Sequence, residues 1–304
     1  MRRMRLVIHG KAAANEALRS AVGEFRSAGN QLDVRVTWER GHAATFAREA
    51  AEDGCEVVIA GGGDGTIGEV TQGLLAARAS QTALAVLPLG TANDFARLLG
   101  VPTDDPLAAL HLAASGRRTA IDVGLVNDLP FINVASGGFG AEVTARTPAE
   151  LKENLGGAAY SITALLSAPD LKPYPCRLLV GDQHHDLSVT LLAVGNGRFA
   201  GGGYDVAPQA RLNDGLLDLT LVPAVAFSEL PALVAELFQI DSADNEHVLY
   251  RQLPAFELQF EEETALNLDG EPTRGRAFRF SVLPGRLQVV APAAPPANLN
   301  DCET

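Results

Sequence analysis

Cysteine, tryptophan and positive charge are all scarce in this chain. Cys55, Cys176 and Cys302 are its three cysteines in 304 residues. An odd number at such distances matches neither a disulfide framework nor a zinc pattern, so we expect a reducing, cytoplasmic environment. Lys and Arg number 24 against 37 Asp and Glu, which gives a net charge of −13. Because binding to nucleic acid depends on neutralising phosphates with positive charge, we expect no nucleic-acid partner.

Long hydrophobic runs are also missing. No segment reaches the roughly 18 apolar residues that a membrane span requires, and the apolar run after Arg5 ends at His9, too early for a signal peptide. We therefore expect no transmembrane segment and a soluble, cytoplasmic protein that can still touch the inner membrane surface. With 47% hydrophobic and 20% charged residues, the chain can bury a sizeable core, which excludes disorder as its general state.

The charge is distributed unevenly, which indicates two modules. Residues 1–124 carry a net charge of −1 and residues 125–304 a net charge of −12. At roughly 100 to 200 residues per domain, two domains are expected from the length alone. We predict an N-terminal domain over 1–125, a C-terminal domain over 126–291 and a disordered, proline-containing tail over 292–304.

The first 125 residues alternate between strand and helix patterns. Short apolar or alternating runs predict strands over 5–9, 32–38, 56–60 and 83–87, and helical spacing predicts helices over 14–28, 42–53, 67–78 and 94–99. Gly29 and Gly54 follow two of these helices as stop signals, and Asn93 or Thr91 is expected to cap the last one. Strands that feed helices this regularly predict an α/β domain with a parallel, Rossmann-like sheet.

The remaining sequence reads as an all-β module. We predict strands over 131–136, 176–181, 187–195, 216–222, 254–260, 264–269 and 276–291, and helices over 148–167 and 228–238. Turn residues separate the strands, so the expected architecture is an antiparallel β-sandwich.

A glycine-rich loop follows one of the buried strands of the first module. Gly61, Gly62, Gly63 and Gly65 occur within five residues, next to Asp64. Main chain without Cβ atoms can approach a phosphate closely, and the following helix adds the positive end of its dipole. The alternative is a tight strand-to-helix turn with no ligand. A P-loop pattern is absent, and the acidic residue of a dinucleotide fingerprint is missing from the next strand, so hydride chemistry is the weaker interpretation.

These residues resemble a known family. The motifs that carry the resemblance are GGGDGT at 61–66, PLGTANDFAR at 88–97, VRVTWERG at 34–41, ASGGFGAE at 135–142, VGNGRFAGGG at 194–203, LNDGLLDL at 212–219 and LNLDGEP at 266–272. Together they are similar to the catalytic domain of diacylglycerol kinases and their bacterial lipid kinase relatives of the YegS type. GGDGT alone is shared with NAD kinases and 6-phosphofructokinases, and the later motifs distinguish them. The resemblance implies an active site in the cleft between an α/β domain and a β-sandwich.

The resemblance also implies where ATP binds. The expected contacts for its phosphates and the rest of the nucleotide are Gly62, Gly63, Asp64, Gly65, Thr66, Ile67, Gly68, Thr37 and Thr91. This chain departs from the family at two positions, because it has His9 and Gly68 where the family usually has Asn. Contacts made by the main chain survive such changes, whereas contacts made by the side chain do not.

Two acidic turns in the second module complete the expected site. Taken alone, Asn213-Asp214-Gly215 and Asp269-Gly270 are typical of hairpin turns. By resemblance, Asp214 is a ligand for Mg²⁺ or Ca²⁺, together with main-chain oxygens of Arg211 and Leu216. Resemblance also assigns Glu271 as the base that accepts a proton from the lipid hydroxyl, with Asp269 as a helper or competing candidate. Alternation along an extended chain would place both carboxylates on one face.

The sequence therefore predicts an ATP-dependent lipid kinase that acts on a hydroxyl of diacylglycerol or a phosphatidylglycerol-like lipid at a membrane surface. Two alternatives stay open: an NAD kinase-like enzyme with a soluble substrate, and a nucleotide-binding regulator without catalysis. The presence of Asp214, Asp269 and Glu271 together counts against the regulator. Which lipid is used and how the chain assembles are left open.

Overall fold

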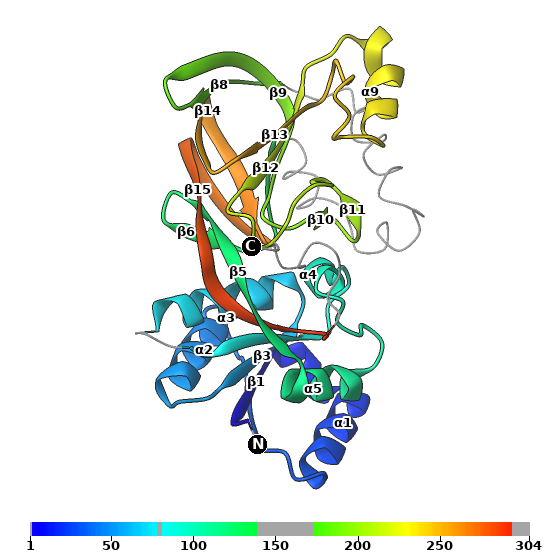
Figure 1. The fold of residues 1–304 in the computed structure, drawn as a ribbon, viewed down its shortest axis with the longest axis vertical. Coiled ribbons are helices and arrows are strands. Elements are labelled where there is room, and N and C mark those ends of the chain that lie inside the picture. Colours follow the sequence, from blue (N-terminus) through cyan, green and yellow to red (C-terminus); the bar gives the residue numbers. More distant parts are fainter. Residues whose placement is uncertain (1, 78–80, 139–172, 294–304) are drawn as a thin grey trace. The chain divides into compact units, whose positions relative to one another are not determined.

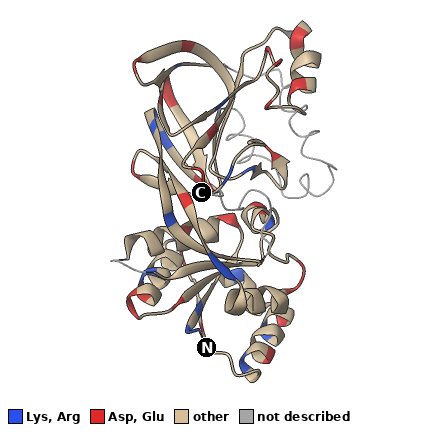
Figure 2. Ribbon diagram, viewed as in Figure 1, with Lys and Arg blue, Asp and Glu red and all other residues tan. Residues whose placement is uncertain are grey.

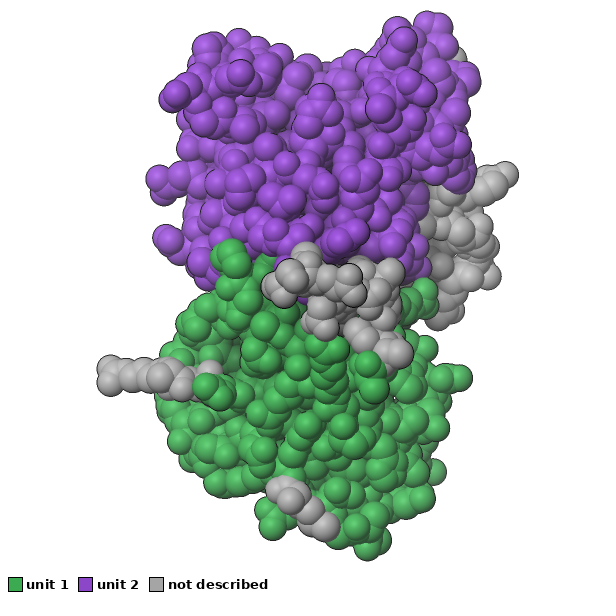
Figure 3. Space-filling view, in the orientation of Figure 1, with its two compact units in different colours: residues 1–122, 284–304 green, residues 123–283 purple. Residues whose placement is uncertain are grey.

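The chain divides into two compact units. The computed structural model describes residues 2–77, 81–138 and 173–293 (Figure 1). Unit 1 comprises Met1–Asp122 and Pro284–Thr304, and unit 2 comprises Val123–Leu283 (Figure 3). Residues 284–291, predicted as part of the C-terminal domain, thus belong to unit 1. The predicted helix over 148–167 and the tail from 294 onward lie outside the described residues.

Unit 1 contains a parallel sheet with the order β4-β3-β1-β2. Its strands are β1 (Met4–Ile8), β2 (Leu32–Val36), β3 (Val57–Gly62) and β4 (Ala83–Pro88). Every residue of β1, β3 and β4 is buried, as expected of parallel strands covered on both faces. The end of β15 (Glu271–Ala291) adds a further parallel contact, with Val289 beside Leu84 of β4.

Helices cover this sheet. They are α1 (Glu16–Ser27), α2 (His42–Glu52), α3 (Asp64–Ala76), α4 (Asp94–Leu98) and α5 (Pro106–Ser115), with a 3₁₀ helix at Gly10–Ala14. Helix α1 packs with α5, and α2 packs with α3, and Figure 1 shows the two pairs on opposite sides of the sheet. Gly29 and Gly54 follow α1 and α2 with φ of 90° and 76°, which confirms the predicted glycine stops.

Unit 2 is built from antiparallel strands. They are β6 (Leu129–Phe131), β7 (Val134–Gly138), β8 (Tyr174–Val180), β9 (Gln183–Gly195), β12 (Leu217–Pro223), β13 (Leu249–Leu253) and β14 (Ala255–Leu268), with a small pair β10 (Phe199–Ala200) and β11 (Tyr204–Asp205). Helix α9 (Leu230–Glu236) follows a 3₁₀ turn at Phe227–Glu229. The long strands β9 and β14 each pair with both β7 and β8. Acidic residues mark the ribbon at α9 (Figure 2).

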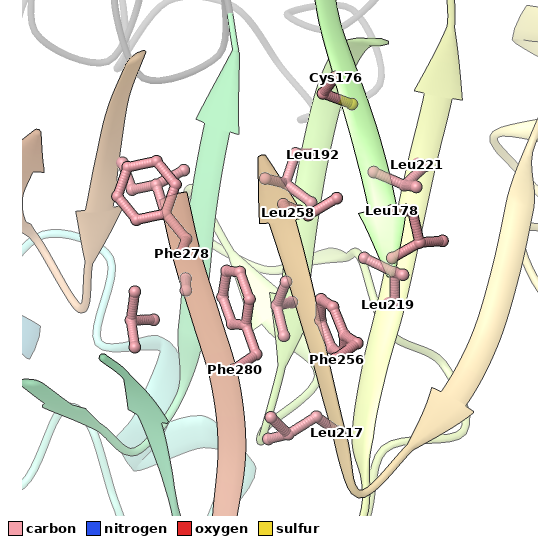
Figure 4. Packing of buried hydrophobic residues seen from close by; sticks show 14 of the residues in the cluster. Cys176, Leu178, Leu192, Leu217, Leu219, Leu221, Phe256, Leu258, Phe278 and Phe280 are labelled. Atoms are coloured by element: carbon pink, nitrogen blue, oxygen red, sulfur yellow. The ribbon is translucent and has the colours of Figure 1, made fainter. Parts of the chain in front are cut away.

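The core of unit 2 forms around β12 and the β14–β15 pair. Leu217, Leu219 and Leu221 project from β12 into this core (Figure 4). Phe256 stacks on Phe280 with 4.7 Å between ring centroids. This packing fixes β12, and with it the turn that precedes β12 in the sequence.

The chain passes between the units twice, within β5 (Arg117–Val126) and within β15. At the unit 1 end of both crossings, the N–H of Gly285 donates to Asp122 Oδ1 over 2.7 Å. Asp122 is 1% exposed, whereas Gly285 lies at the surface.

Candidate functional site

The predicted nucleotide-binding residues of unit 1 meet at one edge of its parallel sheet. Gly61 of β3 lies beside Ile8 of β1, and Ile8 lies beside Val36 of β2. On the other side of β3, Gly62 is paired with Pro88 of β4. Thr37, the glycine loop and the turn with Thr91 therefore all emerge from the carboxyl ends of neighbouring strands, where open α/β sheets bind ligands.

The loops after β3 and β4 are in direct contact. A Cβ atom on Gly90 would lie 2.5 Å from the Cα atom of Gly63, and one on Gly62 would lie 2.3 Å from Oγ1 of Thr66. The N–H of Leu89 also donates to the carbonyl of Gly62 over 2.9 Å. Packing between the loops thus requires glycine at 90, and packing against the first turn of α3 requires glycine at 62. The N-terminal end of α3 carries the positive end of its dipole.

Asp64 joins the two loops through its side chain. Its carboxylate accepts the N–H groups of Asp94 and Phe95 over 3.3 and 3.1 Å, and so caps α4. The prediction that Asn93 or Thr91 caps this helix is confirmed for Asn93 in position but not in hydrogen bonding. Asn93 occupies the cap position with φ of 51°, but its side chain makes no cap hydrogen bond and bonds to Gly90 instead.

Thr37 and its surroundings are held by the main chain. Thr37 is 8% exposed, and its N–H donates to the carbonyl of Ile8 over 2.9 Å. His9, where the family usually has Asn, accepts the N–H of Lys11 on Nδ1 over 3.2 Å. Gly68 is buried inside α3. Thr91, in contrast, is exposed on its turn.

The proposed metal ligands lie on a turn of unit 2 immediately before β12. Gly215 has a φ of 74°, and Asp214 Oδ1 accepts the N–H of Leu216 over 3.0 Å. Asn213 Oδ1 is buried without a hydrogen-bond partner among the described residues. A turn whose side-chain donors are oxygens fits a hard cation such as Mg²⁺. Within the described ranges, no three His, Cys, Asp or Glu side chains gather into a metal site, so main-chain oxygens of Arg211 and Leu216 would have to contribute.

Asp218 is a functional candidate that the sequence analysis missed. It belongs to β12 and is 1% exposed. Burial raises the pKa of Asp218 to about 7, the hydrogen bond from Tyr250 opposes this shift, and the charge of Asp214 adds to it. The alternation of leucine and polar residues along β12 predicts a solvated polar face. However, both faces of this strand are buried, because Thr220 on the same face is also covered, bonding to Val206.

Asp269 and Glu271 differ in their surroundings. Asp269 and Gly270 form the turn between β14 and β15 with φ of 50° and 98°, so the chain there is not extended and the expectation of a shared face does not hold. The carboxylate of Asp269 accepts three N–H groups, from Ile132 over 2.6 Å and from Asn133 and Val134 over 3.0 Å each. Glu271 is the partly exposed first residue of β15.

Family models match nearly the whole chain. Residues 3–126 match the diacylglycerol kinase catalytic domain, and residues 133–291 match the YegS C-terminal NAD kinase beta sandwich-like domain. The class that fold and site define is therefore an α/β catalytic domain of the diacylglycerol kinase type joined to a β-rich domain.

Similar proteins place the chain more narrowly. A protein of Chromohalobacter salexigens named probable lipid kinase YegS-like is 46% identical over 94% of this chain and 92% of its own length. A protein of Pseudomonas aeruginosa with the same name is 44% identical over 96% of this chain and 95% of its own length. A crystal structure of a candidate diacylglycerol kinase from Bacillus anthracis matches with a TM-score of 0.79 and 25% sequence identity. The match covers 96% of this chain and 98% of that protein. The chain belongs to the YegS-like family within the diacylglycerol kinases.

Proposed function

We propose that this protein is a lipid kinase that transfers the γ-phosphoryl group of ATP to a hydroxyl of a glycerolipid, either diacylglycerol or a phosphatidylglycerol-like lipid. The observation that carries the proposal is the contact between the glycine loop and the β4–α4 turn in a chain of this family. Phosphoryl transfer depends mainly on positioning and on neutralising charge. A rigid pair of loops at the N-terminal end of a helix meets both needs.

ATP is proposed to bind at the carboxyl ends of the parallel strands of unit 1, the edge at which Rossmann-like sheets bind nucleotides. The N–H groups at Gly62–Gly65, where α3 begins, would receive the phosphates, and Thr66, Ile67 and Gly68 would line the same site from the first turns of the helix. Thr37 and Thr91 follow neighbouring strands at the same edge and would contact the rest of the nucleotide. Asp64 supports this arrangement, since its two hydrogen bonds to α4 tie both loops together.

Mg²⁺ is proposed to be held in unit 2 by Asp214 and main-chain oxygens of Arg211 and Leu216, with Ca²⁺ as the alternative ion. When bound, a divalent cation supplies positive charge that neutralises the oxygens around it. The buried Oδ1 of Asn213 supports this assignment.

Glu271 is proposed as the general base that accepts the proton of the lipid hydroxyl. Asp269 is the weaker candidate, because three main-chain N–H groups already occupy its two oxygens. Asp269 lies in the turn after β14 and Glu271 begins β15, both in unit 2, which we propose to be a β-sandwich domain.

The acceptor is proposed to be a lipid presented at a membrane surface on the cytoplasmic side. No helix in the described part of the chain is long and apolar enough to cross a membrane. The relatives named as lipid kinases support this substrate class, whereas the likeness of the C-terminal domain to NAD kinases keeps a soluble acceptor as the alternative.

The test is a phosphoryl-transfer assay with radiolabelled ATP and Mg²⁺, in which mixed micelles of diacylglycerol or phosphatidylglycerol compete with soluble NAD. We expect labelled lipid and no labelled NAD. Glu271→Gln should lower kcat by about 10² to 10⁴, the usual contribution of a general base, and calorimetry should show ATP affinity near that of the wild type. Labelled NAD without labelled lipid would refute the lipid assignment, and ATP binding without any transfer would favour a regulator.

A further inference from the structure

Asp218 is an acidic residue in an unusual place. It lies near the start of β12, which pairs with β9 on one side and β13 on the other. Its neighbours Leu217 and Leu219 point into the core of unit 2, and Asp218 itself is 1% exposed. A carboxylate buried this deeply must be matched by donors or by a cation.

The donors that reach Asp218 come from β13 and serve only one of its oxygens. Tyr250 donates its hydroxyl to Oδ1, and Gln252 donates from Nε2 to the same oxygen over 3.1 Å. The second oxygen, Oδ2, is buried without a hydrogen-bond partner among the described residues. Half of this carboxylate therefore lacks the partner that buried polar atoms normally have.

The same two β13 side chains hold the segment that leads into the proposed metal turn. The hydroxyl oxygen of Tyr250 accepts the N–H of Gln209 over 3.1 Å, and Gln252 Nε2 lies 3.4 Å from the carbonyl of Gln209. Gln209 precedes Arg211 by two residues. Tyr250 thus connects Asp218 to the beginning of the turn through two hydrogen bonds.

Asp218 and the turn are also linked by charge. Asp214 is close enough for its charge to act on Asp218, and Asn213 Oδ1 in the same turn is a second buried oxygen without a partner among the described residues. The carboxylates of Asp214 and Asp218 repel one another unless positive charge is present. Their arrangement is the one that a divalent cation would stabilise.

We propose that Asp218, held by Tyr250 and Gln252, is a positioning residue for the cation turn at 211–216: its buried oxygen attracts the ion bound there, and Tyr250 fixes the turn against β13. This inference rests on the proposed Mg²⁺ site. Mg²⁺ demands near-ideal geometry from its ligands, and loss of a group that orients metal ligands typically costs 10- to 100-fold in affinity.

The experiment is calorimetric titration of Mg²⁺, and separately of Ca²⁺, into the full-length protein at pH 8 without nucleotide or lipid. The variants are Asp214→Ala, Asp218→Asn, Tyr250→Phe and Tyr204→Phe. Tyr204→Phe is the matched control, because it also removes a partly buried, hydrogen-bonded tyrosine hydroxyl from unit 2, one that donates to the carbonyl of Leu237 over 2.9 Å. Thermal unfolding in EDTA measures the stability of each variant without the ion.

We expect Asp214→Ala to abolish binding, Asp218→Asn and Tyr250→Phe to weaken it by about 10- to 100-fold, and Tyr204→Phe to leave it unchanged. Asp218→Asn should not lower the unfolding temperature in EDTA, since it removes repulsion between two acids. If Tyr250→Phe and Asp218→Asn bind as tightly as the wild type while Asp214→Ala does not bind, the positioning role is refuted and the metal turn stands. If Asp214→Ala also binds normally, the metal turn is refuted as well. If Asp218→Asn does not fold, the Mg²⁺ affinity of Tyr250→Phe alone tests the positioning role.

Discussion

Replacing Asp269 by asparagine should unfold unit 2 more easily while leaving the chemistry largely intact. The two acids of the LNLDGEP motif look equivalent in sequence, yet the carboxylate of Asp269 accepts three N–H groups, from Ile132, Asn133 and Val134, at the passage from β6 to β7. Because Asp269 is 8% exposed, we expect its carboxylate to organise this segment rather than to face a substrate.

The expected loss of stability can be worked out from these hydrogen bonds. The N–H groups of Asn133 and Val134 both reach Oδ1, which asparagine retains as its amide oxygen. Oδ2, which accepts the N–H of Ile132 over 2.6 Å, becomes an NH₂ group that faces another donor. A hydrogen bond to a charged group contributes about 1.5–3 kcal/mol, and an unsatisfied buried donor costs about 1–3 kcal/mol more. We therefore expect a destabilisation of about 2.5–6 kcal/mol, or roughly 5–24 °C in Tm.

Differential scanning calorimetry and the lipid kinase assay, applied to the single variants Asp269→Asn and Glu271→Gln, test whether Asp269 is structural and Glu271 catalytic. Asp269→Asn should lose stability and keep most of its kcat below its own Tm. Glu271→Gln, on the partly exposed first residue of β15, should show the opposite pattern. A normal Tm combined with a fall in kcat as large as that of Glu271→Gln would refute the reasoning and make Asp269 the base.

The remaining predictions concern loop packing and pH. Gly90→Ala places a Cβ 2.5 Å from the Cα of Gly63, so the loops must separate, and we expect ATP affinity measured by calorimetry to fall at least about tenfold. An unchanged affinity would mean that nucleotide binding does not need this contact. The hydrogen bond to Glu236 raises the pKa of His247 above its usual 6.5, and the charge of Glu246 acts in the same direction. Because the folded-state pKa is raised, this contribution to stability is complete below pH 6.5 and is lost as pH rises through the folded-state pKa. Thermal unfolding from pH 6 to pH 9 should therefore decline less steeply in His247→Gln than in the wild type, and parallel curves would contradict this.

Local signals in the sequence predicted much of unit 1. The strand predicted over 56–60 and the helix stops at Gly29 and Gly54 depend on residues close together in the chain. The structure confirms them, with the strand observed at Val57–Gly62. The meeting of Thr37, the glycine loop and Thr91 follows from strand order, because parallel strands present their carboxyl ends at one edge.

Features that depend on contacts between residues far apart in the chain could not be predicted from local sequence patterns. Asp64 caps a helix that begins 30 residues later, and its own motif gives no indication of this partner. The predicted strands over 254–260 and 264–269 are one strand, β14, whose register shifts between Gln259 and Thr264. Three consecutive glutamates, Glu261, Glu262 and Glu263, resemble a loop in sequence, whereas in the structure they are exposed positions of the strand.

The discontinuity of unit 1 has a consequence for synthesis on the ribosome. Its first 122 residues emerge early, but the strand end that lies beside β4, at Val289, is made only after the 161 residues of unit 2. At about 5–20 residues per second, this delay lasts roughly 10–30 s. During that time β4 is an unpaired sheet edge of buried, apolar residues, the kind of edge that recruits other chains. Nascent chains stalled before Pro284 should thus be the species that chaperones most need to protect.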